Sequence, residues 1–212
     1  MYNEFVMEDI MIKSVEELVE NEIVINKSRF IGIITHVSSE AEVKDYLELY
    51  REMYPDASHH CYAYIIDGKM KCSDDGEPSK TAGAPMLNVL EKQELNQVLA
   101  ITIRYFGGIK LGAGGLVRAY SQSVSEALLK ANIVTFEAAD LYDIYFDYSF
   151  IRQIDYYIRT MNIPVSNKRY EEKVIYSIYV KNDDFFQSVQ QATGNQYIKK
   201  FIRQDFIKES NS

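Results

Sequence analysis

The hydrophobic positions of the chain follow two rhythms, which together predict a mixed α+β protein. Residues 98–106 (VLAITIRYF) are mostly apolar, a pattern typical of a buried β-strand. Beyond residue 115 the apolar positions recur every three or four residues, as in a helix that buries one face. These positions are Leu116, Tyr120, Val124, Ala127, Leu128 and Ala131. Further strands are predicted within 13–37 (two) and over 61–67, and further helices after the Ser39–Glu42 capping box and over 86–95.

The last third of the chain has a clear order of elements. Strand-like segments lie at 141–149, 164–172, 173–180 and 197–207, and helical segments lie at 150–162 and 182–194. Their order is β-α-β-β-α-β, which is the split βαβ or ferredoxin-like arrangement. The sequence therefore predicts a ferredoxin-like fold for this part of the chain.

Charge and composition both change near residue 137. Residues 1–137 carry 13 Lys and Arg against 21 Asp and Glu, whereas residues 138–212 carry 10 of each kind. Nine of the ten glycines precede the change, while fifteen Tyr and Phe follow it. We therefore predict two domains, 1–137 and 138–212.

The overall composition bounds the environment of the protein. A hydrophobic content of 47% is ordinary for a soluble globular chain, and no segment approaches the ~20 apolar residues of a membrane helix. Residues 1–17 are acidic and lack the basic region and apolar run of a secretory signal. Two cysteines, Cys61 and Cys72, make no disulfide framework and favour a reducing cytoplasm. The net charge of −8 disfavours strong non-specific binding of nucleic acid.

One stretch, RYFGGIKLGAGGLVRAY (104–120), joins a strand to a helix and holds five of the ten glycines. No Asp or Glu occurs between residues 94 and 126, although three cations do. Glycines, cations and a helix N-terminus together favour an anion site. The alternative is that the glycines let the helix pack closely on the sheet, and the spacing fits neither the P-loop nor the dinucleotide-binding pattern. The candidate anion-binding residues here are Arg104, Gly107, Gly108, Lys110, Gly112, Gly114, Gly115 and Arg118.

A second stretch, SDDGEPSKTAGAPML (73–87), is long and irregular, as functional loops often are. Asp74, Asp75 and Glu77 could hold Mg²⁺, which takes one or two carboxylates together with substrate phosphates. The alternative, which we favour, is that they form turns and cap local N–H groups. Ser79, Lys80 and Thr81 are candidates to donate to an anion, or else they cap the following helix.

The adjacent residues His59, His60 and Cys61 suggest a metal site or a Cys–His nucleophile. Neighbours on a strand point to opposite faces, so His59 and Cys61 could share a side while His60 could not. A zinc site needs about four ligands, so no metal site is predicted. His60 remains a candidate general base beside Asp74 and Arg104.

The many Tyr and Phe residues after residue 137 could stack on RNA bases, as in RNA-recognition modules. However, the aromatic residues that share a strand face with Ile144 fit a core. Asp143 and Asp147 on the other face would repel phosphate. Core packing is the interpretation that we favour.

Three motifs of this chain closely resemble those of the IMPACT/YigZ family of small cytoplasmic proteins. They are HHCYAYIID (59–67), SDDGEPSKTAGAPML (73–87) and RYFGGIKLGAGGLVRAY (104–120), within a match that spans residues 27–131. The resemblance implies an N-terminal α/β sandwich like the second domain of ribosomal protein S five and domain four of elongation factor G. It implies a C-terminal domain like the ferredoxin-type fifth domain of that factor. Eukaryotic relatives are translational regulators that compete for the activator of an initiation-factor kinase, whereas for bacterial members the resemblance implies no settled reaction.

These observations predict a cytoplasmic, translation-associated binding protein. Its glycine-rich basic loop would recognise RNA phosphate or a ribosome-linked protein partner, with no cofactor and no membrane. One alternative is a phosphate-handling enzyme, a Mg²⁺-dependent hydrolase or transferase acting on a small phosphorylated ligand. Asp74 or Asp75 would then hold Mg²⁺, and His60 would act as the base. Another alternative is a purely protein–protein regulator that uses the acidic helix 40–52.

Overall fold

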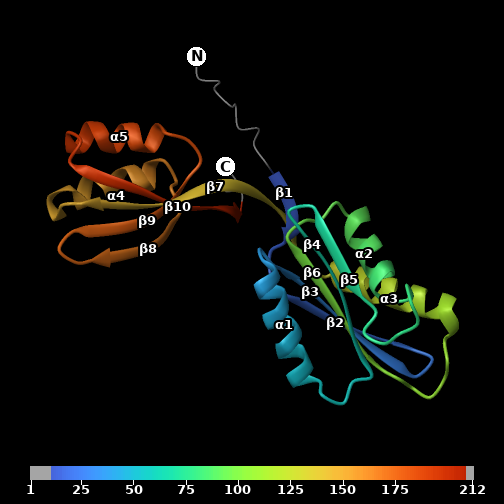
Figure 1. Ribbon diagram of the computed structural model, residues 1–212. Coiled ribbons are helices and arrows are strands. Elements are labelled where there is room, and N and C mark those ends of the chain that lie inside the picture. The colour runs from blue at the N-terminus through green and yellow to red at the C-terminus, as the bar shows by residue number, and fades with distance from the viewer. Residues whose placement is uncertain (1–10, 209–212) are drawn as a thin grey trace. The chain divides into compact units, whose positions relative to one another are not determined.

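The computed structural model describes residues 11–208 and divides them into two compact units (Figure 1). One unit comprises Ile12–Phe136 and the other Glu137–Ile207. Most of the N-terminal segment in which we predict no secretory signal lies outside the described residues. Within them, no helix combines the length and the apolar character that crossing a membrane requires.

The first unit is built on an antiparallel sheet whose strand order is β2-β3-β6-β4-β5. β6 lies at its centre and carries the apolar run predicted for a buried strand. The strands of this unit are β1 (Met11–Val15), β2 (Val19–Ile25), β3 (Ser28–His36), β4 (His59–Ile66), β5 (Lys69–Ser73) and β6 (Val98–Tyr105). Its helices are α1 (Glu40–Met53), α2 (Gly83–Lys92) and α3 (Gly112–Leu128).

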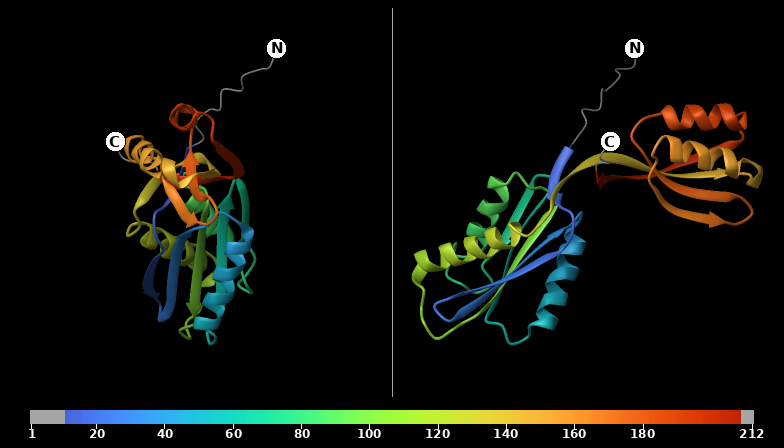
Figure 2. Two further views of the ribbon diagram at one scale, coloured as in Figure 1. Left: turned by 90° about the vertical axis from the view of Figure 1, so that its left-hand side faces the viewer. Right: turned by 180° about the vertical axis from the view of Figure 1, so that it is seen from behind.

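Helices cover both faces of this sheet, because its strands carry apolar residues on both sides (Figure 2). α2 and α3 pack on one face against residues such as Phe30 and Ala63, and α1 packs on the other against Ile31 and Ile101. The capping box is present in part. Ser39 accepts from the backbone N–H of Glu42, while the Glu42 carboxylate bonds Ser38 rather than Ser39.

The second unit has the predicted βαββαβ order. Its elements are β7 (Ile133–Phe146), η1 (Tyr148–Phe150), α4 (Ile151–Thr160), β8 (Val165–Tyr170), β9 (Val174–Val180), α5 (Asp184–Thr193) and β10 (Tyr197–Lys208). β7 begins within the first unit, and the five-stranded sheet to which it belongs also includes β1. In the second unit the strand order is β10-β7-β9-β8, and β7, β8 and β9 pair antiparallel. The chain is therefore a two-domain α+β protein with a ferredoxin-like second part.

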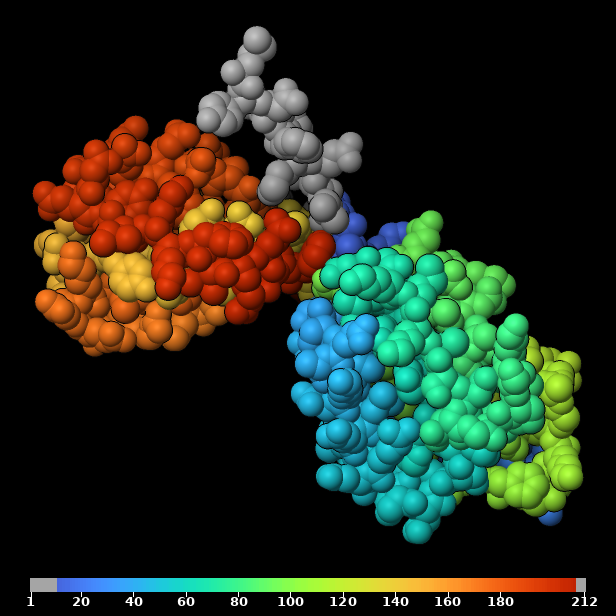
Figure 3. Space-filling model, in the orientation of Figure 1, coloured from blue at the N-terminus to red at the C-terminus, as the bar shows by residue number. Residues whose placement is uncertain are grey.

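The aromatic residues of the second unit mainly build its core. Phe146, Tyr176 and Phe185 are fully buried between the sheet and the helices α4 and α5. On the other sheet face, Asp143 accepts a hydrogen bond from Ser177 and forms an ion pair with Arg169. The favoured interpretation of the aromatic residues as core is thus in line with their burial. β10 departs from this pattern, since its side chains are largely exposed along the surface of the unit (Figure 3).

Candidate functional site

A buried ion pair links the 73–87 motif to the 104–120 motif in the first unit. Nη1 of Arg104, on β6, lies 2.5 Å from Oε1 of Glu77, in the loop between β5 and α2. The two side chains are only 6% and 4% exposed. The hydroxyl of Tyr120, on α3, donates to the same carboxylate oxygen at 2.7 Å. One carboxylate therefore joins a strand, a loop and a helix.

The strand register explains why these groups meet. Arg104 pairs with Phe30 of β3 and with His59 of β4, so all three side chains emerge on the face covered by α2 and α3. The guanidinium carbon of Arg104 lies 5.3 Å from the centre of the Phe30 ring, within range of a cation–π contact. Nε2 of His59 lies 3.8 Å from Oε1 of Glu77, while its Nδ1 donates to the carbonyl of Asp75 at 2.8 Å.

The carboxylates of Asp74 and Asp75 are engaged in structural hydrogen bonds. Asp74 accepts from the backbone N–H groups of Lys80, Ala82 and Gly83 at 2.7–3.0 Å. Burial raises the pKa of Asp74, but these three donors outweigh it and hold the pKa below its usual value. Asp75 accepts from the backbone N–H of His60 at 2.6 Å and from Arg51 at 3.2 Å. These contacts support the turn-and-cap interpretation of the DDGEP loop.

The cap of Asp74 also explains a difference from the predicted helix boundary. The sequence predicts a helix over 86–95, whereas α2 begins at Gly83 and its N-cap residue, Ala82, has no side chain that could cap it. Asp74 supplies the missing acceptor from nine residues upstream, and Pro85 is tolerated in the first turn because its missing N–H would be unpaired there.

The candidates Ser79, Lys80 and Thr81 do not meet the glycine loop. Thr81 is buried, and its hydroxyl donates to the carbonyl of Pro78 at 2.6 Å. Ser79 and Lys80 are exposed, and none of the three lines the cavity described below. Of the DDGEPSK segment, Glu77 and Pro78 are the residues that reach it.

His60 does not lie beside Arg104 in the structure. His59 takes that place instead. His60 pairs with Ile103, whose side chain lies on the face that α1 covers, whereas Arg104 lies on the opposite face. Burial lowers the pKa of His60 below its usual value, which favours the neutral imidazole. Cys61 is fully buried, and burial raises the pKa of its thiol to about 12, so it is a poor nucleophile.

The glycines of the loop differ in what their local surroundings require of them. A Cβ at Gly107 would lie 2.1 Å from the backbone of Lys27, so only glycine fits against the β2–β3 turn. Gly112 has φ +68°, a left-handed conformation that favours glycine. A Cβ at Gly114 would meet only Nη1 of Arg118, at 3.8 Å. Close packing of α3 on the sheet comes instead from Gly32, where a Cβ would lie 2.6 Å from the carbonyl of Ser123.

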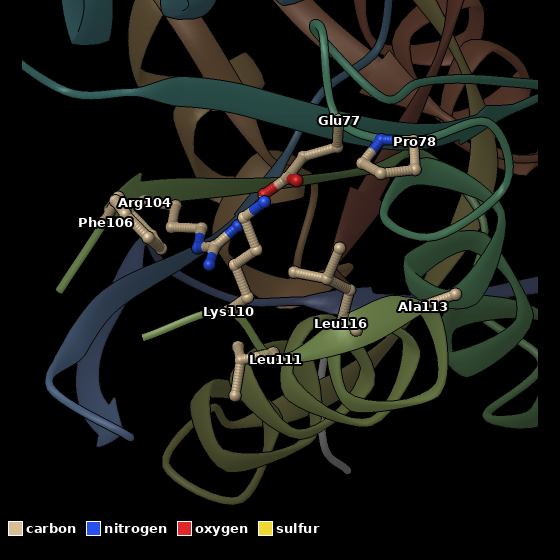
Figure 4. A pocket seen from close by; sticks show the side chains of 9 residues that line it. Glu77, Pro78, Arg104, Phe106, Lys110, Leu111, Ala113 and Leu116 are labelled. Carbon is tan, nitrogen blue, oxygen red and sulfur yellow. The ribbon is translucent and has the colours of Figure 1, made fainter. Parts of the chain in front are cut away.

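A cavity of about 360 Å³ opens where the two loops meet (Figure 4). The Arg104 and Glu77 side chains extend into it from the strand and the loop, and α3 closes the opposite side. Its remaining lining is mainly apolar. The complete lining is Glu77, Pro78, Arg104, Phe106, Lys110, Leu111, Gly112, Ala113 and Leu116.

The first turn of α3 borders this cavity and has no side-chain cap. Its N-cap residue is Leu111, whose side chain makes no capping hydrogen bond, and the first turn contains no acidic residue. Three exposed cations lie on neighbouring segments: Lys110 lines the cavity, Arg118 approaches Gly114, and the backbone of Lys27 approaches Gly107. The described residues include no ion-pair partner for any of them. Arg104, in contrast, is neutralised by Glu77.

Sequence reasoning missed Lys27 and three further members of the site. No sequence pattern marks Ser28 as a site residue. Its hydroxyl nevertheless accepts hydrogen bonds from the Gly107 N–H at 3.1 Å and from Arg104 at 3.4 Å. His59 could have been found from strand alternation. Tyr120 was assigned only to the apolar stripe, although a buried Tyr usually finds a partner for its hydroxyl. Among the described residues, no group of three or more His, Cys, Asp and Glu is arranged to hold a metal ion.

These features define a class of two-domain α+β proteins whose first domain joins a DDGEP loop to a glycine-rich helix start through a buried carboxylate–guanidinium pair. Residues 26–128 match the Impact N-terminal domain family. The chain is 41% identical over 174 residues to IMPACT family member YvyE of Bacillus subtilis (strain 168), across 81% of this chain and 80% of that protein. The chain therefore belongs to the IMPACT family.

Two further similarities extend this finding. IMPACT family member YigZ of Escherichia coli (strain K12) is 43% identical over 109 residues, which cover 49% of this chain and 53% of that protein. The chain thus matches most of YvyE but only about half of YigZ. A crystal structure of a hypothetical protein is 28% identical with a TM-score of 0.67, across 91% of this chain and 98% of that one.

Proposed function

We propose that this protein is a translation-associated binding protein that recognises RNA phosphate at the start of α3. Membership of the IMPACT family supports the link to translation, since the resemblance to that family implies translational regulators among its eukaryotic members. The structure of the first unit supports the location. The other predicted partner is a ribosome-linked protein, and the experiment below distinguishes it from RNA.

The observation that carries the proposal is the uncapped first turn of α3 beside three exposed cations. The first N–H groups of a helix have no intrahelical acceptor, and the helix dipole favours an anion there. Phosphate is the anion that this arrangement commonly binds. Because Arg104 is neutralised by Glu77, the attraction comes from Lys27, Lys110 and Arg118 rather than from Arg104.

The carboxylate contacts favour binding over Mg²⁺-dependent catalysis. Asp74 and Asp75 accept hydrogen bonds from backbone and side-chain donors, and Glu77 is paired with Arg104. A metal ion would have to displace these donors. His60, the candidate base, lies on the other face of the sheet from Arg104.

Co-sedimentation with ribosomal particles at low salt tests the proposal. The wild-type protein should pellet with the particles, and the Lys110→Gln/Arg118→Gln variant should stay in the supernatant. A variant with the same charge change elsewhere, Lys44→Gln/Lys92→Gln, is the matched control and should still pellet. Failure of the wild type to pellet would contradict the proposal, and binding that survives nuclease treatment would identify a protein partner instead of RNA.

A further inference from the structure

The cavity in front of the Glu77–Arg104 pair has features that phosphate binding does not use. Its lining combines apolar side chains, such as Leu111 and Leu116, with one buried ion pair. Phe106 stands at its edge and is 49% exposed, so its ring is accessible to a ligand. A volume of about 360 Å³ is within the usual range for small-molecule sites.

The polar groups in this cavity are incompletely paired. Arg104 donates from Nη1 to Glu77 and from Nη2 to Ser28, but its buried Nε has no hydrogen-bond partner among the described residues. Oε1 of Glu77 receives both Arg104 and Tyr120, and no described side chain donates to Oε2. Buried polar groups are normally satisfied. The cavity thus offers apolar walls together with the polar edge of the Arg104 guanidinium and the Glu77 carboxylate.

This combination matches a flat ring whose edge carries both acceptors and donors. Gly112 and Ala113 belong both to the cavity and to the uncapped first turn of α3. A ligand in the cavity would therefore have any attached phosphate close to the helix N-terminus. Phe106 could stack on the ring, as aromatic side chains do with unpaired bases.

We infer that the cavity binds the base of a ribonucleotide whose phosphate rests on the first turn of α3, an inference that depends on the proposed function for its phosphate site. The base must be unpaired, since a base within a duplex cannot enter a cavity. The nucleotide is either a free mononucleotide or an unpaired residue of an RNA chain, because both present the same chemistry.

Binding of a fluorescent single-stranded oligoribonucleotide tests the inference against an otherwise identical oligomer of abasic residues. The intact oligomer should bind about tenfold more tightly, because base stacking adds to the phosphate contacts. Ala113→Phe should remove this preference by filling the cavity from an exposed position. Val117→Phe, one turn further along α3 and outside the cavity lining, is the matched control and should keep the preference.

The outcomes separate the inference from the proposed function. Equal binding of both oligomers, unaffected by Ala113→Phe, would overturn the inference while leaving the phosphate site in place. Equal binding of a duplex of the same sequence would overturn it as well. Binding of neither oligomer would remove the proposed function and the inference together. Titration with uridine or adenosine monophosphate decides the source, since tight binding that Ala113→Phe abolishes indicates a free nucleotide.

Discussion

Glu77 is the residue on which the two motif loops depend. Its Oε1 atom accepts from Arg104 and Tyr120, and His59 lies 3.8 Å away. A buried ion pair adds little stability compared with a well-packed apolar pair, but removing one partner leaves an uncompensated charge. The pair therefore specifies how the loops meet more than it stabilises the fold.

Glu77→Ala should lower the free energy of unfolding of the first unit by about 3–5 kcal/mol, because Arg104 would remain buried without a counter-charge. Tyr120→Phe, which removes one donor and leaves the ion pair, should cost about 1.5–3 kcal/mol. Urea denaturation measures both values. A loss below about 1 kcal/mol for Glu77→Ala would contradict the role assigned to the pair.

Gly114→Val should retain the fold but weaken binding of an oligoribonucleotide at least about tenfold. The new side chain has space, since the nearest atom to a Cβ would be Nη1 of Arg118 at 3.8 Å, but it would cover the first turn of α3. Gly32→Ala is the contrasting variant. Its Cβ would lie 2.6 Å from the Ser123 carbonyl, so it should destabilise the unit by about 1–3 kcal/mol. Unchanged RNA binding by Gly114→Val would count against the phosphate site.

At the residue scale, the sequence predicted the cluster of cations but not which of them is neutralised by an ion pair. From the local charge pattern, Arg104, Lys110 and Arg118 were equally good candidates for binding an anion. Only the strand register shows that Arg104 faces inward, where Glu77 neutralises it. His59 could have been preferred to His60 by strand alternation, but the sequence does not tell which sheet face carries the cavity.

At the scale of elements, α2 depends on a cap that comes from a distant part of the loop. Asp74 accepts from three backbone N–H groups at and before the helix start. The sequence could not show this, because the usual capping signal lies within three residues of the helix. α3 shows the opposite case, since its start has no side-chain cap at all.

Asp74→Asn should reduce the stability of the first unit by about 1–2 kcal/mol at neutral pH, as expected for losing a good cap. The donors around Asp74 lower its pKa, so its contribution is present above the unfolded pKa of about 3.9 and is lost as the pH falls through the lower folded value. The difference between wild type and variant should therefore be constant from about pH 7 to 5 and shrink below about pH 4. Denaturant curves across this range measure it, and a difference that grows towards acid would be contrary to this assignment.

At the scale of the whole molecule, the chain forms two units with separate cores. The βαββαβ order of the second unit was readable from the sequence because its strands and helices are short and clearly bounded. The extent of β7 was not, since this strand runs from Ile133 to Phe146 and so belongs to both units. Sequence composition changes near residue 137 although the backbone remains in one strand.

Calorimetry should resolve two unfolding transitions, because multidomain chains with separate cores rarely unfold in one step. Glu77→Ala should lower the midpoint of one transition only. Ile144→Ala, which empties part of the fully buried core of the second unit, should lower the other. A single transition that both variants shift equally would show that the two units unfold cooperatively.

The salt dependence of RNA binding tests the phosphate site most directly. The affinity for a single-stranded oligoribonucleotide is measured between low and physiological salt for wild type, Arg118→Gln and Lys44→Gln. If Arg118 contacts a phosphate at the start of α3, its variant should bind more weakly, and the slope of log K against log salt should fall in magnitude by about 0.7. Lys44→Gln, on the opposite face of the sheet, should match the wild type. Identical slopes for all three proteins would contradict the account.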